Sequence, residues 1–270
     1  MTTLAVDIGN TSIHAGLFEG RRLRRRLSVP TRLARQPAAL RRRLAGLGRG
    51  AAQAVICSVV PWATPCVVRA LRAAGCPRVR VVGRDLRVPL KNRYRYPRQV
   101  GQDRLVGAYA AWRQYGDGAR RGRPSGRNPE RVPPRRDESR DCIVCDFGTA
   151  ITIDLVTARG EYLGGVIAPG LGISLEALAS RTALLPKVTL RQPPEPLGRD
   201  TANSIRAGVL YGCAALCDGL VGRLKARYAP KALVVATGGS SALIAKHTRS
   251  ISRLKPNLVL EGLDLLADSK

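Results

Sequence analysis

Acidic and aromatic residues are scarce in this chain of 270 residues. It has 19 aspartates and glutamates against 46 lysines and arginines, a formal net charge of +27, and only 4% aromatic residues. Proteins that bind single-stranded nucleic acid combine basic grooves with aromatic side chains on which bases stack. Because such aromatics do not accompany the arginines here, we expect nucleic acid to bind at most nonspecifically.

The arginines are concentrated in two segments. Residues 21–50 contain eleven arginines and no acidic residue, and residues 117–141 contain eight arginines against five acidic residues. Such clusters can attract nucleic acid, an anionic membrane or an acidic partner. They also occur as solvated helix faces in proteins of arginine-biased composition, which is the interpretation we favour.

Several signatures of nucleotide-binding and hydrolytic proteins are missing. The sequence contains neither Gly-x4-Gly-Lys-Ser/Thr nor Gly-x-Gly-x-x-Gly, so P-loop and Rossmann proteins lose their main support. The two histidines, His14 and His247, stand in unrelated contexts, which argues against a Ser-His-Asp hydrolase.

The seven cysteines show no disulfide-like spacing, which favours a reducing cytoplasm. Cys142 and Cys145 form a CxxC, but on a strand their side chains point to opposite faces. Cys213 and Cys217 can share a helix face, yet no histidine stands nearby to complete a zinc site. We therefore expect buried small side chains rather than a metal or redox centre.

No membrane segment is expected. The longest uncharged stretch, residues 51–68, contains Pro61 and Pro65 and is better interpreted as a strand followed by a helix start. The first residues are uncharged and reach a motif by residue 7, unlike a signal peptide. These features predict a soluble protein without a membrane partner.

Hydrophobic periodicity predicts strands that alternate with helices, and therefore an α/β fold. The first half is expected to form strands at 2–8, 14–20, 54–60 and 79–82, and helices at 33–48, 64–74 and 102–115. The second half is expected to form strands at 142–146, 150–156, 161–167 and 232–237, and helices at 172–180, 203–227 and 259–268. Both halves follow one plan, which indicates an internal duplication.

This plan predicts two domains, at 1–115 and 142–270. The segment between them, 116–141, is rich in arginine, proline and glycine and nearly devoid of apolar residues. Such a composition does not support a packed core, so we expect a flexible insertion.

The most informative motifs are two acidic turns that follow apolar strands. One is Asp7-Ile8-Gly9-Asn10-Thr11 and the other is Asp146-Phe147-Gly148-Thr149-Ala150. Glycine lets the backbone approach a ligand, an aspartate at a strand end can hold a cation, and turn N–H groups face phosphate oxygens. One turn of this type is weak evidence, but two that open the two halves predict a nucleotide clamped between paired domains.

A third candidate lies between these turns, in the segment from Tyr94 to Arg104. There Asp103 precedes Arg104 at the start of a predicted helix. An acid beside a guanidinium can accept a hydroxyl proton while the arginine holds an anionic substrate. The alternative is an ordinary helix N-terminal aspartate with a surface arginine.

Taken together, the motifs closely resemble those of type III pantothenate kinases. They follow in order through nearly the whole chain outside 21–50 and 116–141. They are the two turns, Gly101-x-Asp103-Arg104, Gly164-Gly165-x-x-x-Pro169-Gly170, Ser58-Val59-Val60-Pro61, Ser180-Arg181-Thr182-Ala183-x-Leu185-Pro186 and Ala236-Thr237-Gly238-Gly239.

The resemblance implies two duplicated actin-like (ribonuclease H-like) domains with a nucleotide cleft between them, usually in a homodimer. It implies ATP-dependent phosphorylation of pantothenate to 4′-phosphopantothenate, the first step of coenzyme A biosynthesis. Magnesium would accompany ATP, and potassium or ammonium would be required.

The resemblance also assigns roles to residues. Asp103 is implied as the general base, Asp146 as the ligand of K⁺ or NH4⁺, and Asp7 as lying near magnesium. Thr149 would contact ATP together with the first loop, which comprises Asp7, Ile8, Gly9, Asn10, Thr11, Ser12, Ile13 and His14. The substrate would be contacted by Tyr94, Gly101, Gln102, Asp103, Arg104 and Thr201.

The sequence departs from the family pattern at two positions. Tyr96 stands where Asn is frequent and Gln102 where a small residue is common, which puts substrate affinity rather than catalysis in doubt.

Two rival functions share some of these motifs. One rival is a related kinase or phosphatase acting on another hydroxy acid, which would lack the Tyr94–Arg104 pattern. The other is a non-catalytic nucleic-acid-binding or transcription accessory protein, which intact Asp103, Asp146 and Thr149 disfavour.

Overall fold

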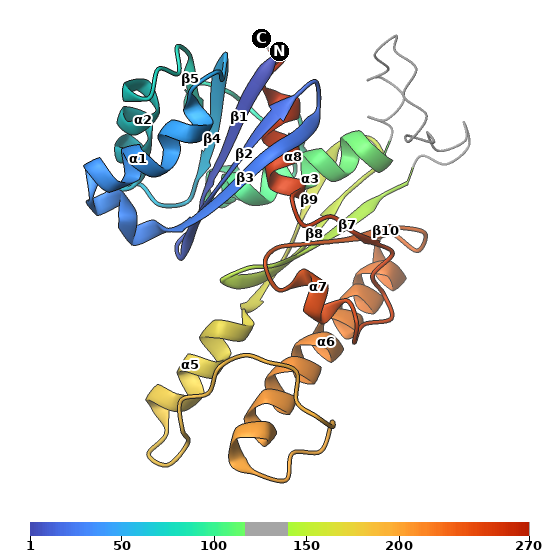
Figure 1. Ribbon diagram of the computed structural model, residues 1–270. Coiled ribbons are helices and arrows are strands. Elements are labelled where there is room, and N and C mark those ends of the chain that lie inside the picture. Colours follow the sequence, from blue (N-terminus) through green and yellow to red (C-terminus); the bar gives the residue numbers. More distant parts are fainter. Residues whose placement is uncertain (117–139, 270) are drawn as a thin grey trace. The chain divides into compact units, whose positions relative to one another are not determined.

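The computed structural model describes residues 1–116 and 140–269 and divides the chain into two compact units (Figure 1). Unit 1 comprises Met1–Ala110 with Asn257–Lys270, and unit 2 comprises Ala111–Pro256. The expected flexible insertion at 116–141 falls almost entirely outside the described residues.

Unit 1 contains a five-stranded sheet. Its strands are β1 (Thr2–Ile8), β2 (Ser12–Glu19), β3 (Arg22–Pro30), β4 (Gln53–Ser58) and β5 (Val79–Val81), in the order β3-β2-β1-β4-β5. The first three form an antiparallel meander, whereas β4 runs parallel to β1 and β5 parallel to β4. Central strands β1 and β4 are buried along most of their length and mainly apolar in the middle, as is usual for strands covered on both faces.

Short helices complete unit 1. Leu40, Leu44 and Leu47 follow each other at helical spacing on α1 and are buried in the core that α1 shares with the sheet and α2. The remaining elements are η1 (Thr31–Arg35), α1 (Pro37–Gly48), α2 (Thr64–Ala73), β6 (Lys91–Asn92), η2 (Pro97–Gln99), α3 (Gln102–Tyr115) and α8 (Leu258–Leu266).

Unit 2 repeats this plan. Strands β7 (Cys142–Phe147), β8 (Ala150–Val156) and β9 (Glu161–Pro169) form an antiparallel meander, and β10 (Leu233–Thr237) and β11 (Arg253–Leu254) continue in parallel on the other side of β7. The order β9-β8-β7-β10-β11 equals β3-β2-β1-β4-β5 of unit 1. The predicted α/β duplication is therefore confirmed. The helices are α5 (Leu171–Arg181), α6 (Thr201–Arg227) and α7 (Ser241–Ile244).

Strand β3 and the two-residue strands β6 and β11 were not predicted, and β3 carries part of the first arginine cluster. β3 is the edge strand of its sheet, and its arginines are exposed while Val29 is buried. Charged side chains on an edge strand discourage pairing with another chain. The interpretation of residues 21–50 as helix faces is therefore wrong for Arg22 to Arg26, where tertiary pairing overrides the polar composition.

The C-terminal helix also departs from the expected division. We expected residues 142–270 to form the second domain, but α8 belongs to unit 1, where it packs against β1, β2 and β4. The sequence Leu258–Leu266 is apolar on nearly every face, and such a helix needs to be buried on all sides. Sequence order alone does not indicate which sheet supplies that cover.

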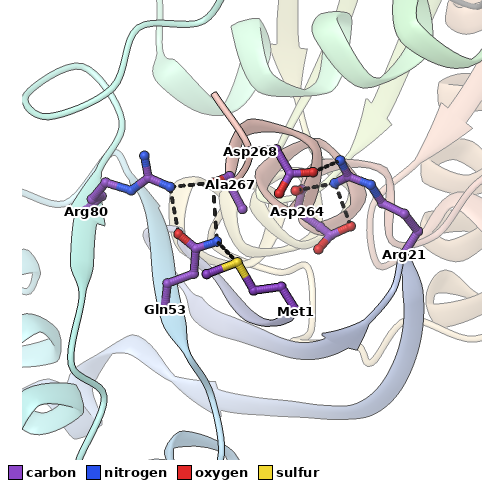
Figure 2. Close-up of polar contacts among 7 residues, drawn as sticks. All are labelled: Met1, Arg21, Gln53, Arg80, Asp264, Ala267 and Asp268. Atoms are coloured by element: carbon purple, nitrogen blue, oxygen red, sulfur yellow. Dashed lines mark hydrogen bonds and ion pairs between the residues drawn. The ribbon is translucent and has the colours of Figure 1, made fainter. Parts of the chain in front are cut away.

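Polar contacts hold the end of α8 in place (Figure 2). Arg80 donates to the carbonyls of Ala267 and Ser269 and to Gln53 Oε1, and Gln53 Nε2 donates to the same Ala267 carbonyl over 3.2 Å. Arg21 forms an ion pair with Asp264 at 3.0 Å and another with Asp268. These guanidiniums satisfy carbonyls that a helix C-terminus leaves without partners.

Helix α6 is long and apolar enough to cross a membrane by length and composition. Half of its most apolar window is buried inside the protein, as in the core helix of a globular domain. Its buried side chains include Leu210, Cys213 and Cys217, which pack in the core of unit 2.

Replacing Gly262 tests how closely α8 packs. A Cβ at this position would lie 2.6 Å from the Val106 carbonyl and 2.7 Å from Val106 Cγ1. We expect Gly262→Ala to destabilise the protein by about 1–3 kcal/mol, because a well-packed core does not accept an added methyl group. The measurement is the urea unfolding midpoint. Gly222→Ala on α6, where a Cβ meets open space, is the control and should be neutral or stabilising by up to about 1 kcal/mol. Equal effects of the two changes would contradict close packing at Gly262.

Candidate active site: two aspartate turns at equivalent strand ends

The first turn leaves the sheet of unit 1 directly after Asp7. Asp7 is the penultimate residue of β1, and the turn Gly9–Thr11 leads into β2, with Gly9 N donating to Ser12 O over 3.0 Å. Asn10 and Thr11 are exposed, whereas Ile8 and Ile13 are buried in the core. Only the backbone of these two isoleucines is therefore suited to contact a nucleotide.

Thr31 fastens this turn from outside. Its hydroxyl donates to Gly9 O over 2.6 Å, and its N–H donates to Thr11 O over 2.9 Å. Thr31 itself is buried, with 1% of its surface exposed. With the carbonyls of Gly9 and Thr11 tied toward the protein, the peptide planes of the turn have a fixed orientation, as a phosphate site built from backbone N–H groups requires.

Asp103 lies in the first turn of α3. Its Oδ1 accepts the backbone N–H of Arg104 over 2.8 Å, and this oxygen lies so close to Gly101 that no Cβ fits there. The positive end of the helix dipole stabilises a carboxylate at this position. Gly101 therefore leaves room for the carboxylate that the proposed base requires.

Cys57 connects Asp7 with Asp103. It is the residue of β4 that pairs with Asp7, and its side chain is fully buried. Burial, followed by the negative charges of Asp7 and Asp103, raises the pKa of the Cys57 thiol well above its ordinary value. The two carboxylates, 96 positions apart in the sequence, thus act on one buried thiol, which places them in the same part of unit 1.

The other predicted residues of unit 1 are held by local contacts. Tyr94 is half-buried, and its N–H donates to the Asn92 side chain over 3.0 Å. Gln102 packs against Gly83, which has a φ of +87° and carries no side chain to obstruct it. Burial, and then the charge of Arg26, lowers the pKa of His14, which pairs with Asp7 across β1 and β2.

The second turn repeats this geometry in unit 2. Asp146 is the penultimate residue of β7, and Gly148 N donates to Ala150 O over 3.1 Å. Gly238 follows β10 with a φ of +91°, and a Cβ on it would collide with Asp146 Oδ1 and lie 2.7 Å from the backbone of Phe147. The glycine at position 238 is thus explained by the approach of its backbone to the Asp146 carboxylate.

The two turns are equivalent but not identical. Ile8 pairs with Ile13 and Phe147 with Ile151, and the strand-to-strand connection is one residue longer in unit 1. Gly170 occupies in unit 2 the place of Thr31, directly after a proline that ends the third strand, and it presses against the Gly148 and Thr149 carbonyls. A bonded threonine in one unit is replaced by close backbone contact in the other.

The Asp146 carboxylate lies at the end of β7, where its Oδ1 is close to Gly238. The carbonyls of Phe147 and Gly238 already accept hydrogen bonds, from Ser240 N over 3.1 Å and from Ser241 Oγ over 2.6 Å. Hard cations prefer carboxylate oxygens, so Asp146 fits a cation in chemical type.

Thr149 and Thr201 belong to unit 2 but come from different elements. Thr149 is exposed in the turn after β7. Thr201 is the exposed first residue of α6, whose N-cap Asp200 accepts from Asn203 N over 2.8 Å. The structure thus divides the predicted site residues between units: Asp7 to His14, Tyr94 and Gly101 to Arg104 lie in unit 1, and Asp146, Thr149 and Thr201 lie in unit 2.

Six of the seven cysteines are buried free thiols, among them Cys142, Cys145, Cys213 and Cys217, whereas Cys66 is partly exposed. Cys145 and Cys217 approach to 3.9 Å between sulfurs across β7 and α6. Among the described residues, no group of three histidine, cysteine or acidic side chains is arranged to hold a metal ion.

Sequence reasoning missed two members of the site, Thr31 and Cys57. The sequence signal that could have revealed Thr31 is that it follows Pro30 in the first half as Gly170 follows Pro169 in the second half. Cys57 gives no such signal, because its position beside Asp7 depends on strand pairing.

Two α/β units with matching strand orders, each with an aspartate turn at the end of its central strand, define a protein built to hold phosphate groups. A family model for type III pantothenate kinase matches residues 3–120 and 133–223. The chain is 40% identical over 277 residues to type III pantothenate kinase 1 of Symbiobacterium thermophilum, covering 97% of this chain and 95% of that one. It is 36% identical over 270 residues to the type III pantothenate kinase of Moorella thermoacetica, covering 97% of each chain. The chain belongs to the type III pantothenate kinase family.

Solved structures agree on the fold. A Baf family transcriptional activator from Campylobacter jejuni superposes with a TM-score of 0.56 at 15% identity, covering 97% of this chain and 96% of that one. The ethanolamine utilization protein EutJ from Carboxydothermus hydrogenoformans gives 0.51 at 14% identity, covering 98% and 90%. At such identities the likeness concerns the fold alone.

Substitution of Gly238 tests the close approach to Asp146. We expect Gly238→Ala to lower the free energy of unfolding by at least about 2 kcal/mol, because a positive φ strains alanine and its Cβ meets the Phe147 backbone. Gly239→Ala, where a Cβ meets open space, should stay within about 0.5 kcal/mol of the wild type. Urea unfolding of the two variants measures the difference, and a Gly238→Ala variant as stable as the wild type would refute it.

Proposed function

We propose that this protein phosphorylates pantothenate to 4′-phosphopantothenate with ATP, the first step of coenzyme A biosynthesis. The observation that carries the proposal is family membership over nearly the whole chain, joined to the equivalent placement of Asp7 and Asp146 in a duplicated fold. A transcription accessory role is disfavoured, because Asp103, Asp146 and Thr149 are intact.

Asp103 is proposed as the general base. Phosphoryl transfer demands little covalent help from the protein and depends on in-line positioning and neutralised charge. Asp103 would orient the pantothenate hydroxyl and accept its proton, with Oδ1 already held by the N–H of Arg104. Arg104 would hold the carboxylate of the substrate, since a guanidinium forms two parallel bonds to such a group. Tyr94, Gly101, Gln102 and Thr201 are proposed as further substrate contacts.

The two turns are proposed to hold the phosphates. Backbone N–H groups between Asp7 and His14 would face the phosphate oxygens, and Asp7 would lie near the magnesium that accompanies ATP. Thr149 would contact the nucleotide from unit 2. Asp146 would bind potassium or ammonium, and a bound cation supplies positive charge near the phosphates where the chain has no Walker lysine.

The remaining features of the proposal come from the family resemblance and composition. We propose a cytoplasmic homodimer, with pantothenate and ATP as its substrates. Nucleic acid would bind only through the net charge of +27, with a steep salt dependence and no sequence preference.

Kinetics of Asp103→Asn test both the reaction and the base. Wild type should phosphorylate pantothenate with MgATP in potassium or ammonium and fail in sodium alone. Asp103→Asn should lose about 10²- to 10⁴-fold in kcat, the typical effect of removing a positioned base. Glu19→Gln is a control, because Glu19 pairs with Thr2 at the opposite end of β1 from Asp7 and bonds Arg24 over 3.0 Å. Activity indifferent to Asp103 would discard the mechanism, and no turnover under any cation would discard the reaction.

Thr31 is predicted to affect the binding of ATP. Thr31→Val keeps the shape but removes the bond to Gly9 O, which should raise the KM for ATP about fivefold to tenfold with a smaller change in kcat. Thr31→Ser keeps the hydroxyl and should remain near the wild-type KM. Steady-state kinetics with varied ATP separate the two variants. A Thr31→Val variant with the wild-type KM would contradict this role, and a loss in Thr31→Ser alone would show that the methyl group rather than the hydroxyl matters.

A further inference from the structure

A pocket in unit 1 remains unexplained by the proposed function. It lies between the C-terminal ends of α1 and α2 and has a volume of about 370 Å³. Its lining consists of Arg41, Arg42, Ala45, Arg49, Ala73 and Ala74. Half of this lining is arginine and none of it is acidic, so the pocket is lined only with positive charge and methyl groups.

The pocket arginines differ from their neighbours in sequence. Arg24 bonds Glu19 at 3.0 Å and Arg25 bonds the Gly46 carbonyl at 2.7 Å. In contrast, none of Arg41, Arg42 and Arg49 forms a hydrogen bond or ion pair with its side chain in the described part of the chain. Three exposed guanidiniums converge here without a carboxylate to neutralise them.

The helix ends do not account for these charges. The last carbonyls of α1 and α2 already accept backbone N–H groups: Arg49 N donates to Ala45 O over 3.2 Å, and Ala74 N donates to Ala70 O over 3.0 Å. The guanidiniums are therefore not needed as helix caps. Arginines on an edge strand can prevent its pairing with another chain. That role does not apply to arginines of α1, which is a helix that covers the sheet.

The pocket is separate from the phosphate turn. Helix α2 begins at Thr64, whose hydroxyl lies 2.8 Å from Ser58 Oγ, and Ser58 pairs with Ile8 beside the turn. Ala73 and Ala74 lie at the other end of this helix of 10 residues, about 15 Å further along its axis. A ligand in the pocket would therefore occupy a second position on unit 1.

We propose that this pocket binds a small anion with two or more phosphate groups. Arginine forms paired, planar bonds to phosphate oxygens, and three guanidiniums match the charge of a diphosphate or triphosphate. The volume falls within the range of small-molecule sites, and the alanine walls limit the ligand to a compact one. An extended nucleic acid is a poorer match, because the pocket lining contains no aromatic side chain on which a base stacks.

Charge-matched variants test the proposal, with inorganic tripolyphosphate as the probe in titration calorimetry at low salt. The pocket variant carries Arg41→Gln, Arg42→Gln and Arg49→Gln, and the control carries Arg22→Gln, Arg43→Gln and Arg223→Gln, which removes the same charge outside the pocket. We expect the pocket variant to bind at least tenfold more weakly than the control, while the control stays within about threefold of the wild type. Binding at the phosphate turns is common to all three proteins and cancels in the comparison.

Two outcomes would overturn the proposal. Equal weakening in both variants would mean that tripolyphosphate responds to net charge alone. Undiminished binding in the pocket variant would place the anion elsewhere.

A second titration, with a short DNA duplex, distinguishes a small anion from nucleic acid. If the duplex loses more affinity in the pocket variant than tripolyphosphate does, the pocket belongs to a nucleic-acid surface and the small-anion assignment is wrong. Thermal unfolding of each variant verifies that the fold is retained, since exposed arginine substitutions change stability little.

Discussion

In each unit an aspartate stands one residue before the end of a strand that is paired on both sides. The strand interior is closed to solvent, so the carboxylate emerges only where the chain turns away from the sheet. The turn has to be short, because the next strand pairs back at once, and it has to be fastened, because its carbonyls lose their sheet partners. Thr31 meets this need in unit 1 and the close approach of Gly170 meets it in unit 2.

The two units therefore share the geometry of the aspartate turn but differ in the residues that surround it. Beside Asp7 the parallel strand offers the thiol of Cys57, and beside Asp146 it offers Thr237. Asp103 comes from a helix start in unit 1, whereas Gly238 brings a bare backbone to Asp146 in unit 2. The first turn thus has a second carboxylate in the same unit, and the second turn has a close backbone contact at its carboxylate.

Several arginines of unit 1 have structural roles. Arg21 and Arg80 are used to hold the end of α8, and Arg24 and Arg25 bond the surface around β3. Arg41, Arg42 and Arg49, which line the pocket, have no such use within the described chain. The acid-free run 21–50 therefore combines structural arginines with a group that forms no side-chain bond in the described residues.

By itself the sequence determined the α/β class, most element bounds and the main acidic turns, because these depend on local periodicity and on residue types adjacent along the chain. Strand 2–8 and helix 102–115 agree with the structure at both ends. Only the tertiary structure decided the rest. It made an arginine-rich segment into edge strand β3, returned α8 to unit 1, and set Cys57 and Thr31 beside the first turn. These outcomes depend on which distant segments pair and pack, and local sequence carries no record of a partner that lies tens or hundreds of residues away.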